Sequence, residues 1–306
     1  MVKVIGIGDN VCDIYIHTGI MYPGGQAFNY AAYARMLGAE SAFIGAHGDD
    51  PVGQRVIEIL DQRGIDRSHT RIYPGEENGF ACVKLEDGDR VFCGSNRGGV
   101  LQKHPIILQE NDLQYISGFE AVHMSNNGFT DLELPKLKGL GPWISYDFSY
   151  RWTEEERVNR VCPYVDVAFA SCSDLSEEEI WNLCEHMHEK GCDIVVATRG
   201  SDGAFASDGE NHFRQLPHLV QAIDTMGAGD SFASAFMVAV AENVTQMGKD
   251  VWKKKDDRKA IIRNGLERAA EFSSKICLIS GGSGDGIRVP EEMYNRIQEI
   301  TKTVSR

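Results

Sequence analysis

Residues 224–230 of this sequence, Asp-Thr-Met-Gly-Ala-Gly-Asp, place glycines and carboxylates at a spacing that suits phosphate chemistry. The small and apolar residues 231–238 follow at once and predict a helix, so this turn would lie at a helix N-terminus. There the first backbone N–H groups have no intrahelical partner, and the helix dipole adds partial positive charge. We therefore predict that the backbone of Gly227, Ala228 and Gly229 can hold a phosphate or a developing anion.

Asp230 adds a second kind of chemistry to the same turn. A carboxylate beside these N–H groups either stabilises the first helical turn or accepts a proton from a hydroxyl brought next to it. The second interpretation makes Asp230 a candidate general base. On spacing alone, a glycine turn with an acidic helix start is the more common explanation.

A second group of polar residues follows the first predicted strand. Residues 2–8 form a β-branched apolar run typical of a buried parallel strand, and Asp9, Asn10 and Asp13 come after it. Open α/β sheets bind ligands just beyond the carboxyl ends of such strands, so these side chains could hydrogen-bond a polyol. An Asx-rich turn explains them about equally well. The run lacks the third glycine of a dinucleotide fingerprint, which argues against that class of site.

A glycine pair, Gly24 and Gly25, precedes a predicted helix that would stop at Gly38. Asn29 lies near the start of that helix, where its amide could face a ligand above the glycine pair. Strand and helix patterns then alternate, with 41–45 as a strand and 51–63 as a helix. Later strands are predicted at 121–124, 143–147, 165–170 and 194–197. This alternation favours an α/β protein with a parallel sheet.

The alternation breaks between residues 71 and 100. Residues 80–85 and 90–93 flank an Asp-Gly turn at 87–88, which predicts an antiparallel hairpin. Together with residues 14–21, this hairpin would form a small β lid beside the main sheet. A lid would exclude water from a reaction site, and a dimerisation flap is the alternative.

Two of these segments resemble the signatures of one family. Residues 224–230 resemble the C-terminal signature of the ribokinase-like, or PfkB-type, carbohydrate kinases, and residues 24–38 resemble the N-terminal one. The resemblance implies one three-layer α/β kinase domain over residues 1–306, with a central, mostly parallel sheet flanked by helices. Residues 12–23 and 70–100 would form its lid. It also implies that Gly25 and Asn29 contact a sugar, with Asp13 beside its neighbours Asp9 and Asn10.

The same resemblance implies sites for ATP and for metal ions. The turn Thr198-x-Gly200-x-x-Gly203 and Thr225 would contact the nucleotide, although an ordinary tight turn explains the first pattern as well. Asp174 keeps the acidic end of a segment that organises water around Mg²⁺. Asp224 and the loop 280–284 would bind a monovalent cation such as K⁺. The cofactors implied are therefore ATP as co-substrate, Mg²⁺ and K⁺.

The segment Asp147-Phe148-Ser149-x-x-Trp152 departs from the Asp-Pro-Asn-x-Arg pattern of many sugar kinases and is similar to that of fructoselysine 6-kinases. Residues 7–10 and 169–171 resemble this subgroup too. The expected function is ATP-dependent phosphorylation of O6 of fructoselysine or a related fructosamine, with Asp147 contacting the substrate. The alternatives are a kinase for another ketose, a ketohexonate or a nucleoside, and a non-catalytic sugar-binding protein on the same scaffold.

Composition limits the partners. A chain of 306 residues with 42% hydrophobic residues can bury a large core, and its net charge of −14 argues against nucleic acid or an anionic membrane as partner. No signal-peptide layout and no apolar run of membrane-spanning length are recognisable. We expect a cytoplasmic protein with reduced thiols, a small-molecule sugar substrate and, as one alternative, a homodimer formed through the lid.

Overall fold

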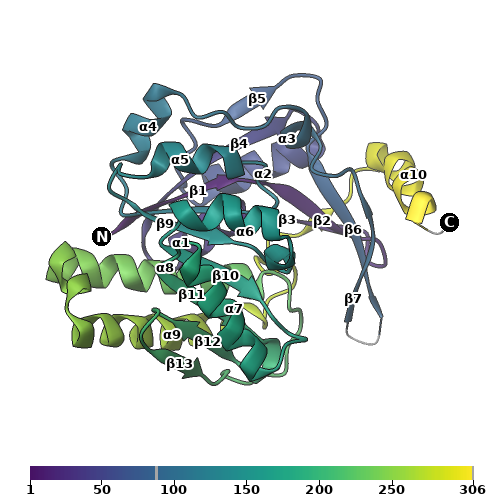
Figure 1. Cartoon of the computed structure of the whole chain (residues 1–306). Helices are drawn as coiled ribbons and strands as arrows, with labels where there is room; N and C mark the ends of the chain where they lie inside the picture. Colours follow the sequence, from purple (N-terminus) through teal and green to yellow (C-terminus); the bar gives the residue numbers. More distant parts are fainter. Residues whose placement is uncertain (87–88, 305–306) are drawn as a thin grey trace.

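The computed structural model describes residues 1–86 and 89–304 and contains two sheets (Figure 1). The large sheet has the strand order β13-β12-β11-β10-β9-β8-β1-β4-β5. Its strands are β1 (Lys3–Gly8), β4 (Glu40–Gly48), β5 (Arg71–Tyr73), β8 (Ala121–Ser125), β9 (Trp143–Asp147), β10 (Val167–Ser171), β11 (Ile194–Thr198), β12 (Ala204–Ser207) and β13 (His212–Gln215). All neighbouring pairs are parallel except those that β12 makes with β11 and β13. The sheet is therefore mostly parallel, as the sequence predicts.

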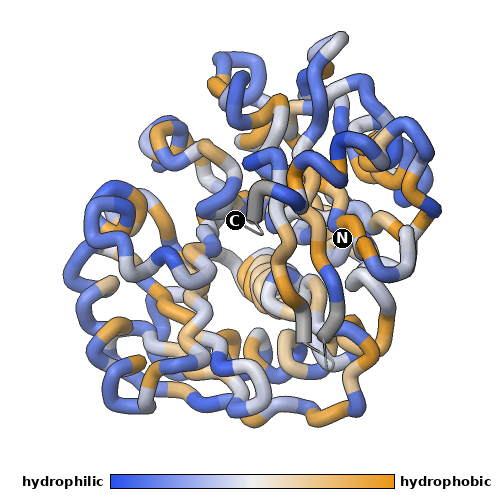
Figure 2. Tube along the Cα trace, turned by 90° about the vertical axis from the view of Figure 1, so that its right-hand side faces the viewer, coloured by the Kyte–Doolittle hydropathy of each residue, from blue (hydrophilic) through white to orange (hydrophobic). Residues whose placement is uncertain are grey.

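Helices cover both faces of this sheet. They are α1 (Gln26–Met36), α2 (Pro51–Gln62), α3 (Val100–Lys103), α4 (Glu110–Ile116), α5 (Leu134–Leu137), α6 (Glu155–Val161), α7 (Glu177–Glu189), α8 (Ala228–Met247), α9 (Lys255–Ile276) and α10 (Tyr294–Val304). Side chains alternate across a strand, so Val4 packs with α1, α8 and α9, while Ile5 and Ile7 pack with α4 to α7. Figure 2 shows hydrophobic stretches gathered inside and hydrophilic ones around the rim. The result is the three-layer α/β architecture expected from the sequence.

The smaller sheet lies beside the large one and has the order β14-β3-β2-β6-β7. It contains β2 (Val11–Tyr15), β3 (Ile20–Gly24), β6 (Gly79–Glu86), β7 (Asp89–Ser95) and β14 (Ile287–Arg288). The two predicted segments thus join in one sheet, although residues 87–88 of the predicted turn lie outside the described residues. Two boundaries differ from the expected ones: β5 pairs with β4 in the large sheet, and β14 comes from near the C-terminus.

The C-terminal helix α10 lies against this smaller sheet (Figure 1). Met293 and Ile300 are buried in the same apolar cluster as Ile14 and Phe80 of the sheet. One side of the smaller sheet is therefore covered by α2 and α10 of the same chain. Among the helices of residues 1–86 and 89–304, none is long and apolar enough to cross a membrane.

Candidate active site

The glycine-rich turn forms the N-terminus of α8, as the sequence predicts. Gly227 is the residue before the helix and has a left-handed backbone, with φ of 72°. A Cβ on Gly227 would lie 2.1 Å from the Tyr33 hydroxyl oxygen, so the protein itself requires a glycine here. Gly229 differs, because apart from its chain neighbours and the backbone of its own helix, no atom of the described chain lies within 4 Å of the place its Cβ would take. The turn is packed against the protein at Gly227 and open at Gly229.

Asp230 meets Asn29 across the interface between α8 and α1. The Asn29 amide nitrogen donates to Asp230 Oδ2 at 2.6 Å, although 201 residues separate the two in the chain. Gly25 precedes α1 with φ of 103°, and a Cβ there would lie 2.9 Å from the Asp9 carbonyl oxygen. Only a glycine lets α1 start this close to the end of β1. The two helix starts that the sequence singled out therefore meet at one site.

Asp9 and Asn10 are buried beneath this site and have protein partners. The Asp9 carboxylate accepts hydrogen bonds from the Gln26 N–H at 2.7 Å, the Ala27 N–H at 3.2 Å and the Ser125 hydroxyl at 2.8 Å. Two of these donors are the first N–H groups of α1, which a carboxylate satisfies well. Asn10 donates to the Ala46 carbonyl oxygen at 2.9 Å and accepts from Asn78 at 3.0 Å. These contacts position α1 and the smaller sheet, and contact of Asp9 and Asn10 with a sugar stays a prediction.

Asp147 ends β9 and lies close to the other carboxylates. Its Oδ1 accepts the Ser149 N–H at 2.6 Å, which Ser149 provides by adopting φ of 50°. Burial, and to a lesser extent the negative charge of Asp230, raises the pKa of the Asp147 carboxyl to about 7. Asp13 is half-buried on β2 and contributes to the same concentration of negative charge. A site with this charge suits a polyhydroxyl ligand or a cationic amine.

We predict that Asp147→Asn makes the folded protein more stable at pH 8 than the parent. In the folded state Asp147 binds a proton with a pKa of about 7, against an ordinary value of 3.8, so the parent loses stability as the pH rises from about 4 to 7. Asparagine has no such dependence. The variant should gain at least about 1 kcal/mol in free energy of unfolding at pH 8, and the gain should vanish near pH 4. Urea denaturation at both pH values measures this. A gain that is equal at the two pH values, or that the exposed Asp174→Asn control also shows, would contradict it.

Asp224 holds three segments of chain together at the entrance to the glycine turn. Its Oδ2 accepts the Tyr15 hydroxyl and the Gly281 N–H, both at 2.7 Å, and its Oδ1 accepts the Met226 N–H at 3.0 Å. Tyr33 reaches the same loop, because its hydroxyl donates to the Gly282 carbonyl oxygen at 3.2 Å. The buried Asp224 carboxylate thus joins the smaller sheet, the glycine turn and the loop before β14.

The predicted nucleotide residues lie at the same edge of the large sheet. Thr198 ends β11, and Gly200 and Gly203 follow it with φ of 55° and 94°. A Cβ on Gly203 would lie 2.2 Å from the Gln215 carbonyl oxygen, so this glycine is needed for the fold. Thr225 is exposed next to the glycine turn, and Asp174 is exposed after the end of β10.

Sequence reasoning missed an exposed apolar loop beside Thr225. Leu216, Leu219, Val220 and Ile223 have exposed fractions of 65%, 77%, 41% and 62%. Apolar side chains in a loop between two polar segments are a signal that could have found it. Tyr15, Gln26, Tyr33 and Ser125, which position the predicted residues, were also missed, because nothing in their local sequence marks them.

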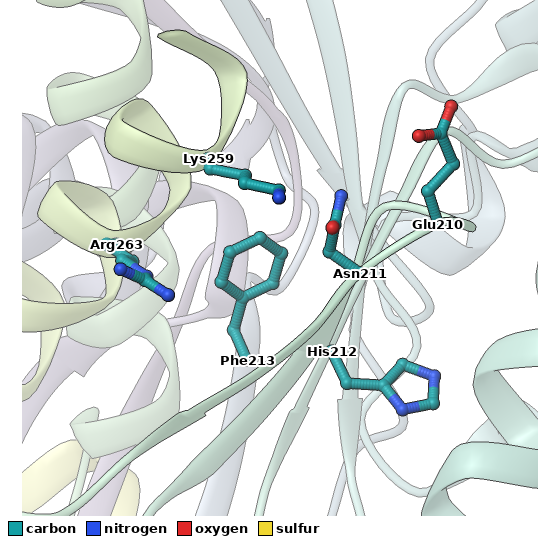
Figure 3. A pocket seen from close by; sticks show the side chains of 6 residues that line it. All are labelled: Glu210, Asn211, His212, Phe213, Lys259 and Arg263. Carbon is teal, nitrogen blue, oxygen red and sulfur yellow. The ribbon is translucent and has the colours of Figure 1, made fainter. Parts of the chain in front are cut away.

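A surface pocket of about 330 Å³ lies elsewhere, between β13 and α9 (Figure 3). Lys259 and Arg263 line it from the helix, and Phe213 lines it from the strand. None of the predicted site residues lines this pocket. The candidate active site is therefore the open edge of the sheet where α1 and α8 begin.

The model of the pfkB family of carbohydrate kinases matches residues 1–261 of this chain. The chain belongs to this family. It is 39% identical to the fructosamine kinase FrlD of Bacillus subtilis strain 168 over 285 residues, which cover 93% of this chain and 94% of that protein. It is 34% identical to the fructoselysine 6-kinase of Escherichia coli K12 over 240 residues, which cover 78% and 89%.

Solved structures support the same fold for this PfkB kinase. A ribokinase from Giardia lamblia superposes with a TM-score of 0.77, covering 99% of this chain and 98% of the other at 17% identity. A ribokinase from Arabidopsis thaliana, complexed with ribose and ATP, gives a TM-score of 0.73 at 19% identity and covers 98% of both chains. This PfkB kinase is accordingly an ATP-dependent sugar kinase with a ribokinase-like fold.

Proposed function

We propose that this kinase transfers a phosphoryl group from ATP to O6 of a fructosamine such as fructoselysine. The observation that carries the proposal is the pairing of Asp230 with Asn29 at the open end of the glycine turn. It places one carboxylate beside backbone N–H groups at a helix N-terminus, which is the arrangement that in-line phosphoryl transfer to a hydroxyl needs. The similarity to a fructosamine kinase and a fructoselysine 6-kinase supports the substrate class.

In the proposed reaction, Asp230 accepts the proton of the sugar hydroxyl while that oxygen attacks the γ-phosphorus of ATP. The bond from the γ-phosphorus to the bridging oxygen breaks, and ADP leaves with that oxygen. The N–H groups of Gly227, Ala228 and Gly229 stabilise the charge on the transferred group. The Ala228 N–H has only a long bond of 3.3 Å to the Thr225 carbonyl oxygen, which a phosphate oxygen could replace.

The sugar would lie between α1 and the smaller sheet. Asn29 and Asp147 would contact its hydroxyls, together with Asp13 on β2, and Gly25 would allow a close approach. A fructosamine carries a secondary amine that is cationic near neutral pH. The concentration of carboxylates around Asp147 favours such a substrate over a neutral ketose.

The nucleotide would occupy the edge between β11 and α8. Thr198, Gly200 and Thr225 would contact its phosphates, and the exposed apolar loop 216–223 would cover its adenine. Gly203 would act through the shape of the turn. Mg²⁺ is held mainly by phosphate oxygens and water in such sites, so the exposed Asp174 fits a water-mediated contact. Bound Mg²⁺ would neutralise charge on the phosphates.

Asp224 fits a structural role better than a monovalent cation site. Its carboxylate already accepts three hydrogen bonds, and a K⁺ ion would have to share its oxygens with those donors. We propose that Asp224 fixes the glycine turn, and we derive no step through a cation. A homodimer through the smaller sheet stays a prediction, which sedimentation of the purified chain would check.

A panel of acceptors tests the proposed function. We expect fructoselysine to give a kcat/KM at least about tenfold above that of fructose, ribose, 2-keto-3-deoxygluconate and adenosine, because a charged contact is worth roughly 1.5–3 kcal/mol. Coupled ADP release measures the rates, and phosphorus NMR of the product locates the phosphate. A ranking with fructoselysine last would overturn the substrate assignment. Sugar binding without ADP release would support the non-catalytic alternative.

A further inference from the structure

Three non-glycine residues of the described chain have a left-handed backbone: Arg97, Phe129 and Ser149, with φ of 59°, 53° and 50°. Each follows a strand closely, β7, β8 and β9 respectively. Such conformations cost of order 1 kcal/mol and concentrate where a protein binds a ligand. Ser149 is explained by the N–H that it gives to Asp147. Arg97 gives its N–H to the Ser95 hydroxyl oxygen at 3.2 Å in the same way. The Arg97 and Phe129 side chains are both exposed.

The loop that contains Arg97 lies against Phe129, although the two follow strands of different sheets. A Cβ on Gly98 would lie 3.2 Å from Cε2 of the Phe129 ring, so the loop after β7 packs on that ring. The same loop touches the start of the smaller sheet, because the Gly98 carbonyl oxygen lies 3.1 Å from the place of a Cβ on Gly79. Gly79 pairs with Val11, which shares its face of β2 with Asp13. The pair therefore borders the proposed sugar site.

The contacts of helix α1 show on which side of Asp230 the Arg97 loop and Phe129 lie. Asn29 contacts Asp230, whereas Gln26, one turn or about 4.5 Å nearer the N-terminus, accepts a hydrogen bond from the Asn127 amide at 3.0 Å. Phe129 follows Asn127 by two residues. The contacts thus run from the proposed base along the start of α1 to Asn127, two residues before Phe129, and the Phe129 ring lies against Gly98, the neighbour of Arg97. A sugar whose reactive hydroxyl lies at Asp230 would point its other end toward this pair.

The charges along this path also change sign. The sugar end contains the carboxylates of Asp13, Asp147 and Asp230, and the outer end contains the Arg97 guanidinium. Among residues 1–86 and 89–304, no carboxylate forms an ion pair with Arg97. Most other arginines near the site are paired, as Arg151 is with Glu154 and Arg157 with Asp131. A molecule with an amine near the sugar and a carboxylate beyond it matches this order.

We propose that Arg97 and Phe129 form a subsite for the amino-acid part of the substrate. The methylene chain of an N-linked lysine packs on the Phe129 ring, and its α-carboxylate pairs with the Arg97 guanidinium, which suits carboxylates through its planar fork of N–H donors. This inference rests on the proposed fructosamine kinase activity and deepens it. It makes the two residues determinants of specificity rather than catalytic residues.

The test compares three acceptors that share one sugar: fructoselysine, its decarboxylated counterpart N-(5-aminopentyl)fructosamine, and N-methylfructosamine. The variants are Arg97→Asn and Phe129→Asn, because asparagine tolerates a left-handed backbone and keeps the fold. We expect Arg97→Asn to lower kcat/KM for fructoselysine about tenfold or more and to leave the other two acceptors within twofold. Phe129→Asn should lower kcat/KM for both long acceptors and spare N-methylfructosamine.

Arg263→Gln on α9 is the matched control, since it removes an exposed arginine far from this site, and it should change none of the three rates. An equal loss on all three acceptors with Arg97→Asn, or no loss on any, overturns the subsite. Failure of the proposed function itself looks different, because the unaltered enzyme would then phosphorylate none of the three fructosamines. Isothermal titration of fructoselysine without ATP gives a second readout, in which Arg97→Asn should raise Kd by the same factor.

Discussion

Asp230→Asn is expected to give a folded kinase that still binds sugar and ATP but turns over about 10²–10⁴-fold more slowly. Asparagine keeps the shape of the side chain and the contact with Asn29, whose amide now lies 2.6 Å from Asp230 Oδ2. It cannot take the proton from the attacking hydroxyl. The loss should therefore appear in kcat, while KM and the binding of substrate stay close to those of the parent.

The control for this variant is Asp256→Asn, which removes another acidic residue from the first turn of a helix, α9. The loss of a favourable interaction with the helix dipole should be similar in both variants, about 0.3–1 kcal/mol. The control should keep its full rate. Single-turnover kinetics with thermal denaturation of both variants separate the two effects. A kcat of Asp230→Asn within tenfold of the parent would show that Asp230 is not the base.

Gly229→Ala should lower activity without lowering stability, whereas Gly227→Ala should lower stability. Nothing in the described chain outside its own helix backbone and its chain neighbours lies within 4 Å of a Cβ at Gly229. The residue is helical, so the alanine variant should be as stable as the parent or more stable by up to about 1 kcal/mol. If the transferred phosphate lies against this backbone, the same methyl group blocks it. We expect kcat/KM to fall by about 10²-fold or more, as for loss of an oxyanion-hole donor.

Gly227→Ala should instead destabilise the protein before any ligand binds. Its φ of 72° strains an alanine by about 1–2 kcal/mol, and the new Cβ would lie 2.1 Å from the Tyr33 hydroxyl oxygen. Adding Tyr33→Phe removes that oxygen and leaves the nearest ring carbon at 3.1 Å, so the double variant should recover part of the lost stability. Urea denaturation and initial rates on all variants test the pair. A Gly229→Ala enzyme with normal kcat/KM would contradict the anion hole.

Local sequence was sufficient for the parts of the fold that depend on neighbouring residues. The β-branched run before Asp9 forms β1, the pattern of residues 51–63 forms α2 with Asp50 capping it, and Gly64 follows with φ of 63°. The motif 224–230 forms the start of α8, with Gly227 in the conformation that only glycine adopts easily. Backbone conformation and burial at these points follow from residue type and from the spacing of apolar residues, and both can be identified in consecutive residues.

The partners across the site depended on the tertiary structure. Asn29 meets Asp230 over 201 residues, Tyr15 meets Asp224 over 209, and β14 joins β3 from the far end of the chain. The start of α1 and Ser125 surround the Asp9 carboxylate, and the local sequence around Asp9 does not indicate these donors. Whether a polar side chain faces a ligand or caps a helix is decided by which N–H groups the fold brings to it.

The sequence by itself determined the kinase family, the parallel sheet and the two glycine-rich helix starts. Family signatures, the spacing of apolar residues and the positions of glycines are all properties of consecutive residues. Only the tertiary structure decided which N–H groups surround the Asp9 carboxylate, that burial raises the pKa of Asp147 to about 7, and that the loop of Arg97 lies against Phe129. These properties arise from burial and from contacts between distant segments. The pKa of a carboxyl group and the partners of a guanidinium depend on the surroundings that folding assembles, and not on the residue type alone.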